Sequence, residues 1–169
     1  IIVVNDGCTD KSIKILQTFR KRIRIVNIPK KSGNKSYAQE KGLQYVTGDI
    51  VITTDGDSVL DRHFVKNISK EFKNPEVVAA AGYVKSIKQN WLTACRQIDY
   101  LISQEIHKKA QSLINALYVI PGCAAAYRTK ILKQYISFDH DTVTEDLDFT
   151  YKYHENKLKV TFCKDDKSF

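Results

Sequence analysis

Residues 50–58 read Ile50-Val51-Ile52-Thr53-Thr54-Asp55-Gly56-Asp57-Ser58, an apolar run that ends directly in two carboxylates. A short run rich in β-branched residues predicts a buried strand, and the polar residues after it predict a turn. Two acidic side chains at the end of a buried strand need a neutralising partner, and a divalent cation that carries a phosphate is a common one. The alternative is an ordinary turn, in which Asp and Gly are favoured.

Short apolar runs alternate with amphipathic stretches on both sides of this segment. Upstream, the pattern predicts strands at residues 1–4 and 23–28 and helices over residues 10–19 and 35–46. Downstream, it predicts a helix at 64–72, a strand at 77–81, a long or broken helix at 91–117, an extended segment at 118–127, short helices near 131 and 150, and a strand at 160–163. This alternation predicts an α/β fold with a mostly parallel central sheet flanked by helices.

The chain has 169 residues, and a domain of this size buries roughly 70% of its unfolded surface. Because no linker or repeat divides the sequence, residues 1–169 are expected to form a single domain. The chain lacks an initiator Met and starts inside a predicted strand, so we expect truncation at both ends. No apolar stretch approaches the ~20 residues that span a bilayer, so the fragment as given is expected to be soluble.

The chain is basic: 27 Lys and Arg face 19 Asp and Glu, for a formal net charge of +8. This charge favours an anionic partner such as a nucleotide diphosphate, a nucleic acid or an acidic lipid surface. Many lysines lie on predicted helix faces, which favours a solvated surface over a nucleic-acid stripe: Lys11, Lys14, Lys66, Lys70, Lys108 and Lys109. No nucleic-acid partner is therefore expected.

Cysteine and histidine spacing points to neither structural zinc nor a catalytic triad. No C-x-x-C or Cys/His ligand pattern joins the four cysteines, which are Cys8, Cys95, Cys123 and Cys163. No shared spacing with a Ser or Cys nucleophile is seen for the histidines, which are His63, His107, His140 and His154.

Ligands bind open α/β sheets at the carboxyl ends of strands, and the first and third strands both end in acidic loops. The loops Asn5-Asp6-Gly7 and Asp55-Gly56-Asp57 are expected to open on one crevice. Asp55 and Asp57 offer the hard oxygen donors that Mg²⁺ and Mn²⁺ prefer. Asp6 could accept hydrogen bonds from a nucleobase or ribose, or could stabilise its own turn.

Three further positions have both a structural and a functional interpretation. Asp10 favours a helix N-terminus whether or not a ligand binds, and Lys35 could face a diphosphate or a base. Thr144-Glu145-Asp146-Leu147-Asp148 could complement a helix dipole, or could supply a general base to a hydroxyl. Asp146 is preferred over Glu145 as that base.

Together these motifs resemble the family-2 inverting glycosyltransferases, particularly the processive membrane-associated synthases of chitin, hyaluronan, cellulose and poly-N-acetylglucosamine. The resemblance covers nearly the whole chain. It rests on an early nucleotide-binding motif at residues 1–10, a G-K-A-x-A-L-N-x-G helix start at Lys35-Ser36-Tyr37-Ala38 with Gly42, a D-x-D at Asp55-Gly56-Asp57, an acceptor-side segment at residues 110–128, and a T-E-D at Thr144-Glu145-Asp146. It implies a Rossmann-like nucleotide-diphospho-sugar transferase fold.

The resemblance also implies a reaction: metal-dependent, inverting transfer of a sugar, preferably N-acetylglucosamine, from a UDP-sugar to a hydroxyl of a glycan acceptor. Asp6 and Asp10 would contact the uridine, Lys35 would support the nucleotide, and Asp55 would lie near the ribose or diphosphate. Asp57, with Asp55, would hold Mg²⁺ or Mn²⁺, and Asp146 would deprotonate the acceptor. The residues implied beside the sugar or acceptor are Gly122, Cys123 and Glu145.

The sequence departs from the family pattern at several points. Glu40 replaces a frequent Asn and Cys8 a usual Ser, and neither change removes a catalytic group. The chain stops at Phe169, before the family's Q-x-x-R-W segment, which leaves open that the fragment is inactive alone. The parent protein would lie at the cytoplasmic face of a membrane, held by segments absent here.

Two alternative functions stay open. The fragment could be a catalytically incomplete nucleotide-sugar-binding or regulatory module. It could also be a sugar nucleotidyltransferase, although that class is expected to carry a Gly- and Arg-rich phosphate loop near the first strand, and the sequence has none there.

Overall fold

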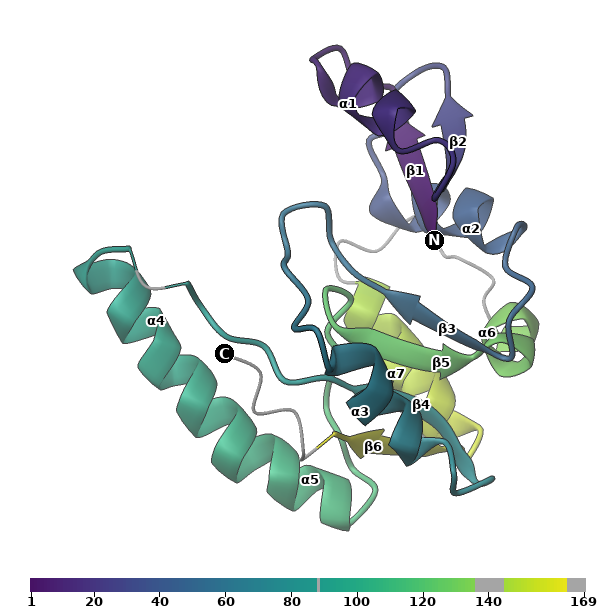
Figure 1. Ribbon diagram of the computed structural model, residues 1–169. Coiled ribbons are helices and arrows are strands. Elements are labelled where there is room, and N and C mark those ends of the chain that lie inside the picture. Colours follow the sequence, from purple (N-terminus) through teal and green to yellow (C-terminus); the bar gives the residue numbers. More distant parts are fainter. Residues whose placement is uncertain (88, 136–144, 164–169) are drawn as a thin grey trace. The chain divides into compact units, whose positions relative to one another are not determined.

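The computed structural model describes the whole chain except residues 88, 136–144 and 164–169 (Figure 1). The chain divides into two compact units. Among the described residues, the first unit comprises Ile1–Gly48 with Glu145, and the second comprises Asp49–Tyr135 with residues 146–163. The single domain expected from the sequence stays a prediction.

The first unit is built on a two-stranded parallel sheet. Its elements are β1 (Ile2–Asp6), α1 (Ser12–Thr18), β2 (Arg24–Ile28) and α2 (Lys35–Leu43). In the pairing of β1 with β2, Val4 lies opposite Val26 and Asp6 lies opposite Ile28. Because parallel strands joined by a crossover helix point the same way, both strands end at the same edge of the sheet.

The second unit contains a four-stranded sheet with the order β3-β5-β4-β6. Its elements are β3 (Ile50–Thr53), α3 (Phe64–Glu71), β4 (Val77–Ala81), α4 (Trp91–Ile102), the π-helix η1 (Ser103–Lys108), α5 (Lys109–Leu113), β5 (Ala125–Arg128), α6 (Thr129–Tyr135), α7 (Glu145–Glu155) and β6 (Lys159–Phe162). β3, β4 and β6 run in one direction, and β5 runs against both of its neighbours. The predicted α/β class is confirmed, and β5 is the exception to the parallel arrangement.

Both faces of this sheet are covered, with α3 in front of it and α7 behind it in Figure 1. All five residues of β4 are buried. On one face, Phe64 and Ile68 of α3 belong to the same buried cluster as Ala80. On the other face, the rings of Tyr127 and Tyr153 lie 6.1 Å apart. Since side chains alternate along a strand, the alanines of β4 give both helices close access to the sheet.

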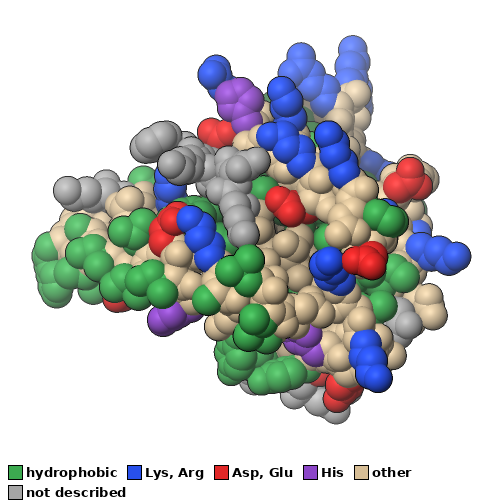
Figure 2. Space-filling view, turned by 90° about the horizontal axis from the view of Figure 1, so that it is seen from below, with side chains coloured by type: hydrophobic (Ala, Val, Ile, Leu, Met, Phe, Trp, Pro, Cys, Tyr) green, Lys and Arg blue, Asp and Glu red, His purple; other side chains and the backbone are tan. Residues whose placement is uncertain are grey.

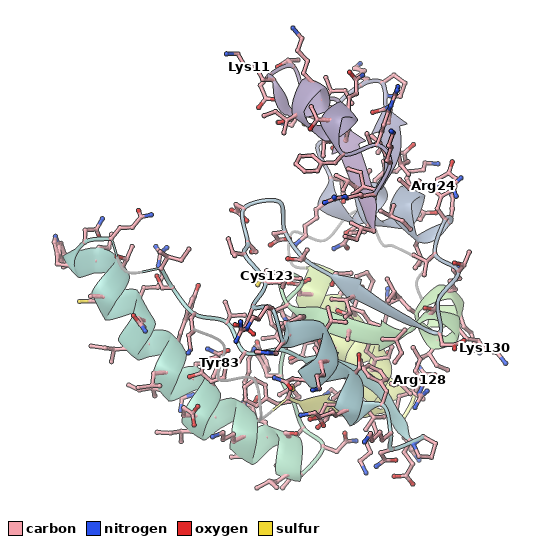
Figure 3. The ribbon with its side chains drawn as sticks, viewed as in Figure 1. Lys11, Arg24, Tyr83, Cys123, Arg128 and Lys130 are labelled. Carbon is pink, nitrogen blue, oxygen red and sulfur yellow. The ribbon has the colours of Figure 1, made fainter. Side chains whose placement is uncertain are left out.

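Arg128 at the end of β5 holds the connection between α3 and β4 (Figure 3). Its Nε donates to the carbonyl of Val77 at 2.8 Å, and its Nη2 donates to the carbonyls of Phe72 and Asn74 at 3.0 and 3.1 Å. The guanidinium also lies 5.5 Å from the centre of the Phe72 ring. Arg128 therefore has a structural role.

The long helix predicted over residues 91–117 forms as α4, η1 and α5 and ends at Leu113. Its apolar side faces outward: no residue of α4 is buried, whereas the buried residues of η1 are Gln104 and Lys108. Figure 2 shows hydrophobic side chains crowded along the left edge, where α4 lies. The large exposed hydrophobic residues of this helix are Trp91, Leu92, Ile98, Tyr100, Leu101, Ile102, Ile106 and Leu113. None of the helices within the described ranges is both long and apolar enough to span a bilayer.

Candidate functional site

Asp6, the last residue of β1, is bonded to the loop that follows β2. The Ser32 backbone N–H donates to Oδ1 of Asp6 at 2.9 Å, and the Ser32 hydroxyl donates to Oδ2 at 2.7 Å. Gly7 has φ +62°, and a Cβ there would lie only 2.3 Å from the backbone nitrogen of Lys31. These contacts hold the loop after β1 against the loop after β2. The Asp6 carboxylate thus bonds the loop after β2 rather than its own turn, and its contact with a nucleotide stays a prediction.

An open hollow lies beside these loops. It is lined by Ile28, Pro29, Lys30, Lys31, Ser32, Asn34 and Tyr37. Asn34 caps α2, because its Oδ1 accepts from the N–H groups of Ser36 at 2.8 Å and Tyr37 at 3.3 Å. An aromatic ring, a proline and two lysines give the hollow apolar walls with positive charge, which suits a ligand that has both a flat ring and an anionic group.

Asp10 and Lys35 are both exposed in the first unit. Oδ1 of Asp10 accepts from the backbone N–H of Ser12 at 2.9 Å, and hydrogen bonding to Ser12 lowers the pKa of the Asp10 carboxyl. Lys35 is the first residue of α2. The structural role expected for Asp10 at a helix start is thus observed, and the nucleotide contacts of both residues stay predictions.

Asp55 and Asp57 lie in the loop after β3, in the second unit. Asp55 is half-buried and Asp57 is exposed, and the N–H of Ser58 donates to the carbonyl of Asp55 at 3.1 Å. Within the described ranges, no three His, Cys, Asp or Glu side chains gather as a metal site. Two carboxylates alone do not complete the six ligands of Mg²⁺, but they suit a cation that arrives with substrate phosphates and water.

Asp146, in the first turn of α7, is bonded to the loop that precedes β5. Its Oδ2 accepts the backbone N–H of Gly122 at 2.7 Å. One turn further on, the Thr150 hydroxyl donates to the Asp146 carbonyl at 2.7 Å and accepts the N–H of Ile120 at 3.0 Å. The structure therefore brings together Asp146 and Gly122, which the sequence predicted as functional residues. Glu145 begins α7, and its side chain lies outside the described residues.

Lys108 of η1 is buried in the same unit. Burial lowers the pKa of its ammonium group to about 8, while Cys123 and Asp146 act electrostatically to raise it. Asp146 also contributes, after burial and Tyr153, to raising the pKa of the Tyr127 hydroxyl well above its usual value. The expectation that Lys108 belongs to a solvated helix face is wrong, because only 9% of its surface is exposed. Of the other lysines in that group, Lys109 is half-buried and the rest are exposed: Lys11, Lys14, Lys66 and Lys70.

The buried ammonium of Lys108 predicts that stability rises with pH on the alkaline side. The pKa is 10.5 in the unfolded chain and about 8 in the folded chain, so between these values the unfolded state binds more protons. The free energy of unfolding should therefore increase by up to about 3 kcal/mol from pH 8 to 10.5. Urea unfolding across this range measures the slope. Lys108→Met should flatten it, and an equal slope in both proteins would contradict the assignment.

Sequence reasoning missed two residues of these clusters, Ser32 and Lys108. Ser32 follows two lysines in an ordinary turn, and nothing in the sequence pairs it with Asp6. Lys108 left a weak signal, since Gln104 and Lys108 are four residues apart and share one side of the helix, opposite the apolar residues Ile102 and Ile106. The helix side that carries Gln104 and Lys108 could therefore be interpreted as the solvent-exposed side.

Comparison with protein families matches residues 1–136 to the model described as "Glycosyl transferase family 2". The chain is 28% identical over 158 residues to the poly-beta-1,6-N-acetyl-D-glucosamine synthase of Staphylococcus epidermidis, covering 91% of this chain and 38% of that protein. It is 24% identical over 149 residues to an N-acetylglucosaminyltransferase of Azorhizobium caulinodans, covering 84% of this chain and 37% of that protein. The chain thus spans less than half the length of these curated relatives.

Two solved structures share the fold. The mannosyltransferase PcManGT from Pyrobaculum calidifontis, in complex with GDP-Man and Mn²⁺, superposes with a TM-score of 0.74 at 20% identity, over 97% of this chain and 45% of that one. S. aureus TarS 1-349, in complex with UDP-GlcNAc, superposes with a TM-score of 0.76 at 18% identity, over 99% of this chain and 47% of that one. The fold expected from the sequence is therefore confirmed.

Proposed function

Because the chain belongs to glycosyl transferase family 2, we propose that it transfers a sugar from a UDP-sugar to a hydroxyl of a glycan acceptor, with inversion at the anomeric carbon. N-acetylglucosamine is our preferred sugar, because the two curated relatives named above are an N-acetylglucosamine polymer synthase and an N-acetylglucosaminyltransferase. The family match favours sugar transfer over nucleotidyl transfer.

One observation carries the proposal: the 2.7 Å hydrogen bond from the Gly122 N–H to Asp146. It fixes one carboxylate oxygen against the loop that the family resemblance implies for the sugar or acceptor. Asp146 is half-buried, so the carboxylate is held in place and still reachable. An ionised carboxylate at a cleft edge can act as a general base when it lies within hydrogen-bond reach of the hydroxyl.

In the proposed reaction, Asp146 accepts the proton of the acceptor hydroxyl. The hydroxyl oxygen forms a bond to the anomeric carbon as the bond from that carbon to the diphosphate oxygen breaks, and UDP leaves with the electron pair. We assign nucleotide contacts to Asp6, Asp10, Lys35 and Asp55, and sugar or acceptor contacts to Gly122, Cys123 and Glu145.

Asp57, with Asp55, would hold the divalent cation, Mg²⁺ or Mn²⁺. A cation there supplies positive charge that offsets the charge of the diphosphate. The exposure of Asp57 and the open surroundings of Gly56 support this assignment, because a Cβ built on Gly56 would lie within 4 Å of no described atom. The fold thus leaves room at this loop for a ligand.

Titration calorimetry with UDP tests the nucleotide site. We expect the 169-residue chain to bind UDP with Mn²⁺ present and to bind it much more weakly once a chelator removes the metal. GDP serves as the matched ligand, and UDP-N-acetylglucosamine, UDP-glucose and GDP-mannose then rank the donors. If a sample with a folded circular dichroism spectrum gives no heat with UDP at any metal concentration, the nucleotide site is refuted.

Transfer itself is tested by adding UDP-N-acetylglucosamine and chitooligosaccharide acceptors. The expected products are UDP and an extended glycan whose new linkage is β, as inversion of an α-linked donor requires. UDP binding without release of UDP or sugar under any condition would favour the alternative of a binding or regulatory module.

A further inference from the structure

Ser32, in the loop after β2, links the end of β1 to the start of α2. Its N–H and its hydroxyl each donate to one oxygen of the Asp6 carboxylate, at 2.9 and 2.7 Å. Its hydroxyl oxygen also accepts the N–H of Asn34 at 3.3 Å and lies 3.1 Å from the Asn34 carbonyl. Because a hydroxyl carries a single proton, the shorter contact with the charged carboxylate takes it. Ser32 thus connects a proposed nucleotide contact to the residue that caps α2.

Two donors, one on each oxygen, determine how the Asp6 side chain is turned. A free Asp side chain rotates about two torsions, and a pair of donors that grips both oxygens removes that freedom. An ionised carboxylate offers about four acceptor positions, and Ser32 occupies two of them. Asp6 is half-buried, so part of its surface stays open to a ligand. The contact with Ser32 therefore orients the carboxylate without using all of its acceptor capacity.

The backbone that carries Ser32 is held in place by other contacts. At Gly7 the two loops approach so closely that a Cβ would lie 2.3 Å from the backbone nitrogen of Lys31. Asn5 and Asn27 lie opposite each other in the paired strands, and the Asn5 Nδ2 donates to the Asn27 Oδ1 at 3.1 Å. These contacts fix the loop before and beside Ser32, which makes Ser32 the orienting partner of the carboxylate.

We propose that Ser32 is a positioning residue for nucleotide binding, whose two donors turn the Asp6 carboxylate so that it accepts an N–H from the edge of the nucleobase. The inference rests on the proposed function, in which Asp6 contacts the uridine. Lys35, which is assigned to the same nucleotide, begins α2 directly after Asn34. Ser32 therefore keeps the two assigned nucleotide contacts in one frame before any ligand binds.

A carboxylate held in one orientation discriminates between the pyrimidine bases. Uracil presents a ring N–H at the position where cytosine presents an unprotonated ring nitrogen, and a carboxylate accepts the first and repels the second. A carboxylate that is free to turn accepts instead from the neighbouring amino group of cytosine. A group placed to receive a ligand N–H rejects the analogue that lacks it. Fixing Asp6 through Ser32 thus favours UDP over CDP.

The test measures the ratio of the Kd for CDP to the Kd for UDP by titration calorimetry with Mn²⁺. Ser32→Ala keeps the backbone donor and loses the hydroxyl, so UDP should bind about tenfold more weakly. The ratio should fall by nearly the same factor, because CDP gains nothing from the fixed carboxylate. Ser32→Thr keeps the hydroxyl and should restore the parent ratio. Thr18→Ala is the matched control, since it removes an exposed hydroxyl that donates to the Ile15 carbonyl at 2.7 Å in the same unit.

Asp6→Asn separates an effect that passes through the carboxylate from a general loosening of the loop. On the Asp6→Asn background, Ser32→Ala should leave the ratio unchanged, because the hydroxyl then has no carboxylate to orient. Ser32→Cys is the second variant should Ser32→Ala fail to fold, and its weakly donating thiol should give an intermediate ratio.

The outcomes distinguish this inference from the function on which it rests. If the parent chain binds UDP and Ser32→Ala weakens UDP and CDP by the same factor, the role of Ser32 is structural and the inference is overturned, while the nucleotide site stands. A ratio that Ser32→Ala still changes on the Asp6→Asn background overturns it too. If a folded parent chain binds neither nucleotide, the nucleotide site itself is refuted, and the inference with it.

Discussion

Asp146→Asn should lower kcat for sugar transfer by about 10²- to 10⁴-fold, the range that a general base contributes. Asn keeps an oxygen that can accept the Gly122 N–H, which now donates at 2.7 Å to Oδ2, so the loop should hold its position. What the variant loses is the ability to take a proton. The affinity for UDP should therefore be unchanged while the chemical step fails, and pre-steady-state transfer with saturating donor measures that step.

Asp148→Asn provides the matched control for this variant. Asp148 lies two residues further along α7 and pairs with Lys152 across one helical turn at 2.7 Å. Losing an ion pair of this kind should cost only about 0.3–0.5 kcal/mol of stability, with transfer intact. If Asp146→Asn retains transfer at the parent rate, Asp146 is not the base.

Asp57→Ala should weaken Mn²⁺-dependent UDP binding by about tenfold or more, because it removes one of the two carboxylates available for a phosphate-bound cation. The exposed position of Asp57 predicts that stability changes by less than about 0.5 kcal/mol. Calorimetric titration of UDP with Mn²⁺ and with chelator measures both sides of the comparison. In the variant, the two titrations should become nearly equal.

Asp99→Ala, on the exposed surface of α4, is the control for the lost charge. It should bind UDP as the parent chain does. If UDP binding by Asp57→Ala still depends fully on Mn²⁺, Asp57 is not required for the metal site, and Asp55→Ala would then show whether Asp55 is required.

The α/β fold could be predicted because its signals are local. The strands at residues 50–53 and 77–81 are short, apolar and bounded by turn residues, and both appear where the pattern predicted them. The direction of β5 could not be predicted in the same way. It depends on how the segment after α5 returns to the sheet, and it is settled by pairing with β3 and β4, far away in the sequence.

The candidate site could be predicted only as a set of loops. The motif order identified Asp146 and Gly122 separately, and the hydrogen bond between them is a tertiary contact across 24 positions. The environment of Lys108 was beyond the sequence, because a lysine on a helix is exposed far more often than it is buried. The outward-facing apolar side of α4 reversed the expectation that apolar periodicity marks the buried side of a helix. The shared crevice expected for the first and third strand ends stays a prediction.

The π-helix η1 determines how two contact points on one continuous helix are rotated relative to each other about the helix axis. Within η1, the Gln104 side chain hydrogen-bonds the backbone of Val84. In α5, the Ser112 hydroxyl accepts the N–H of Phe162 in β6 at 3.1 Å. An α-helix advances by about 100° per residue, so shortening η1 by one residue would turn one attachment away from the sheet by that angle. The helix would then have to release either β6 or the segment after β4. The number of residues between Gln104 and Ser112 is therefore constrained by the two contacts that these side chains make.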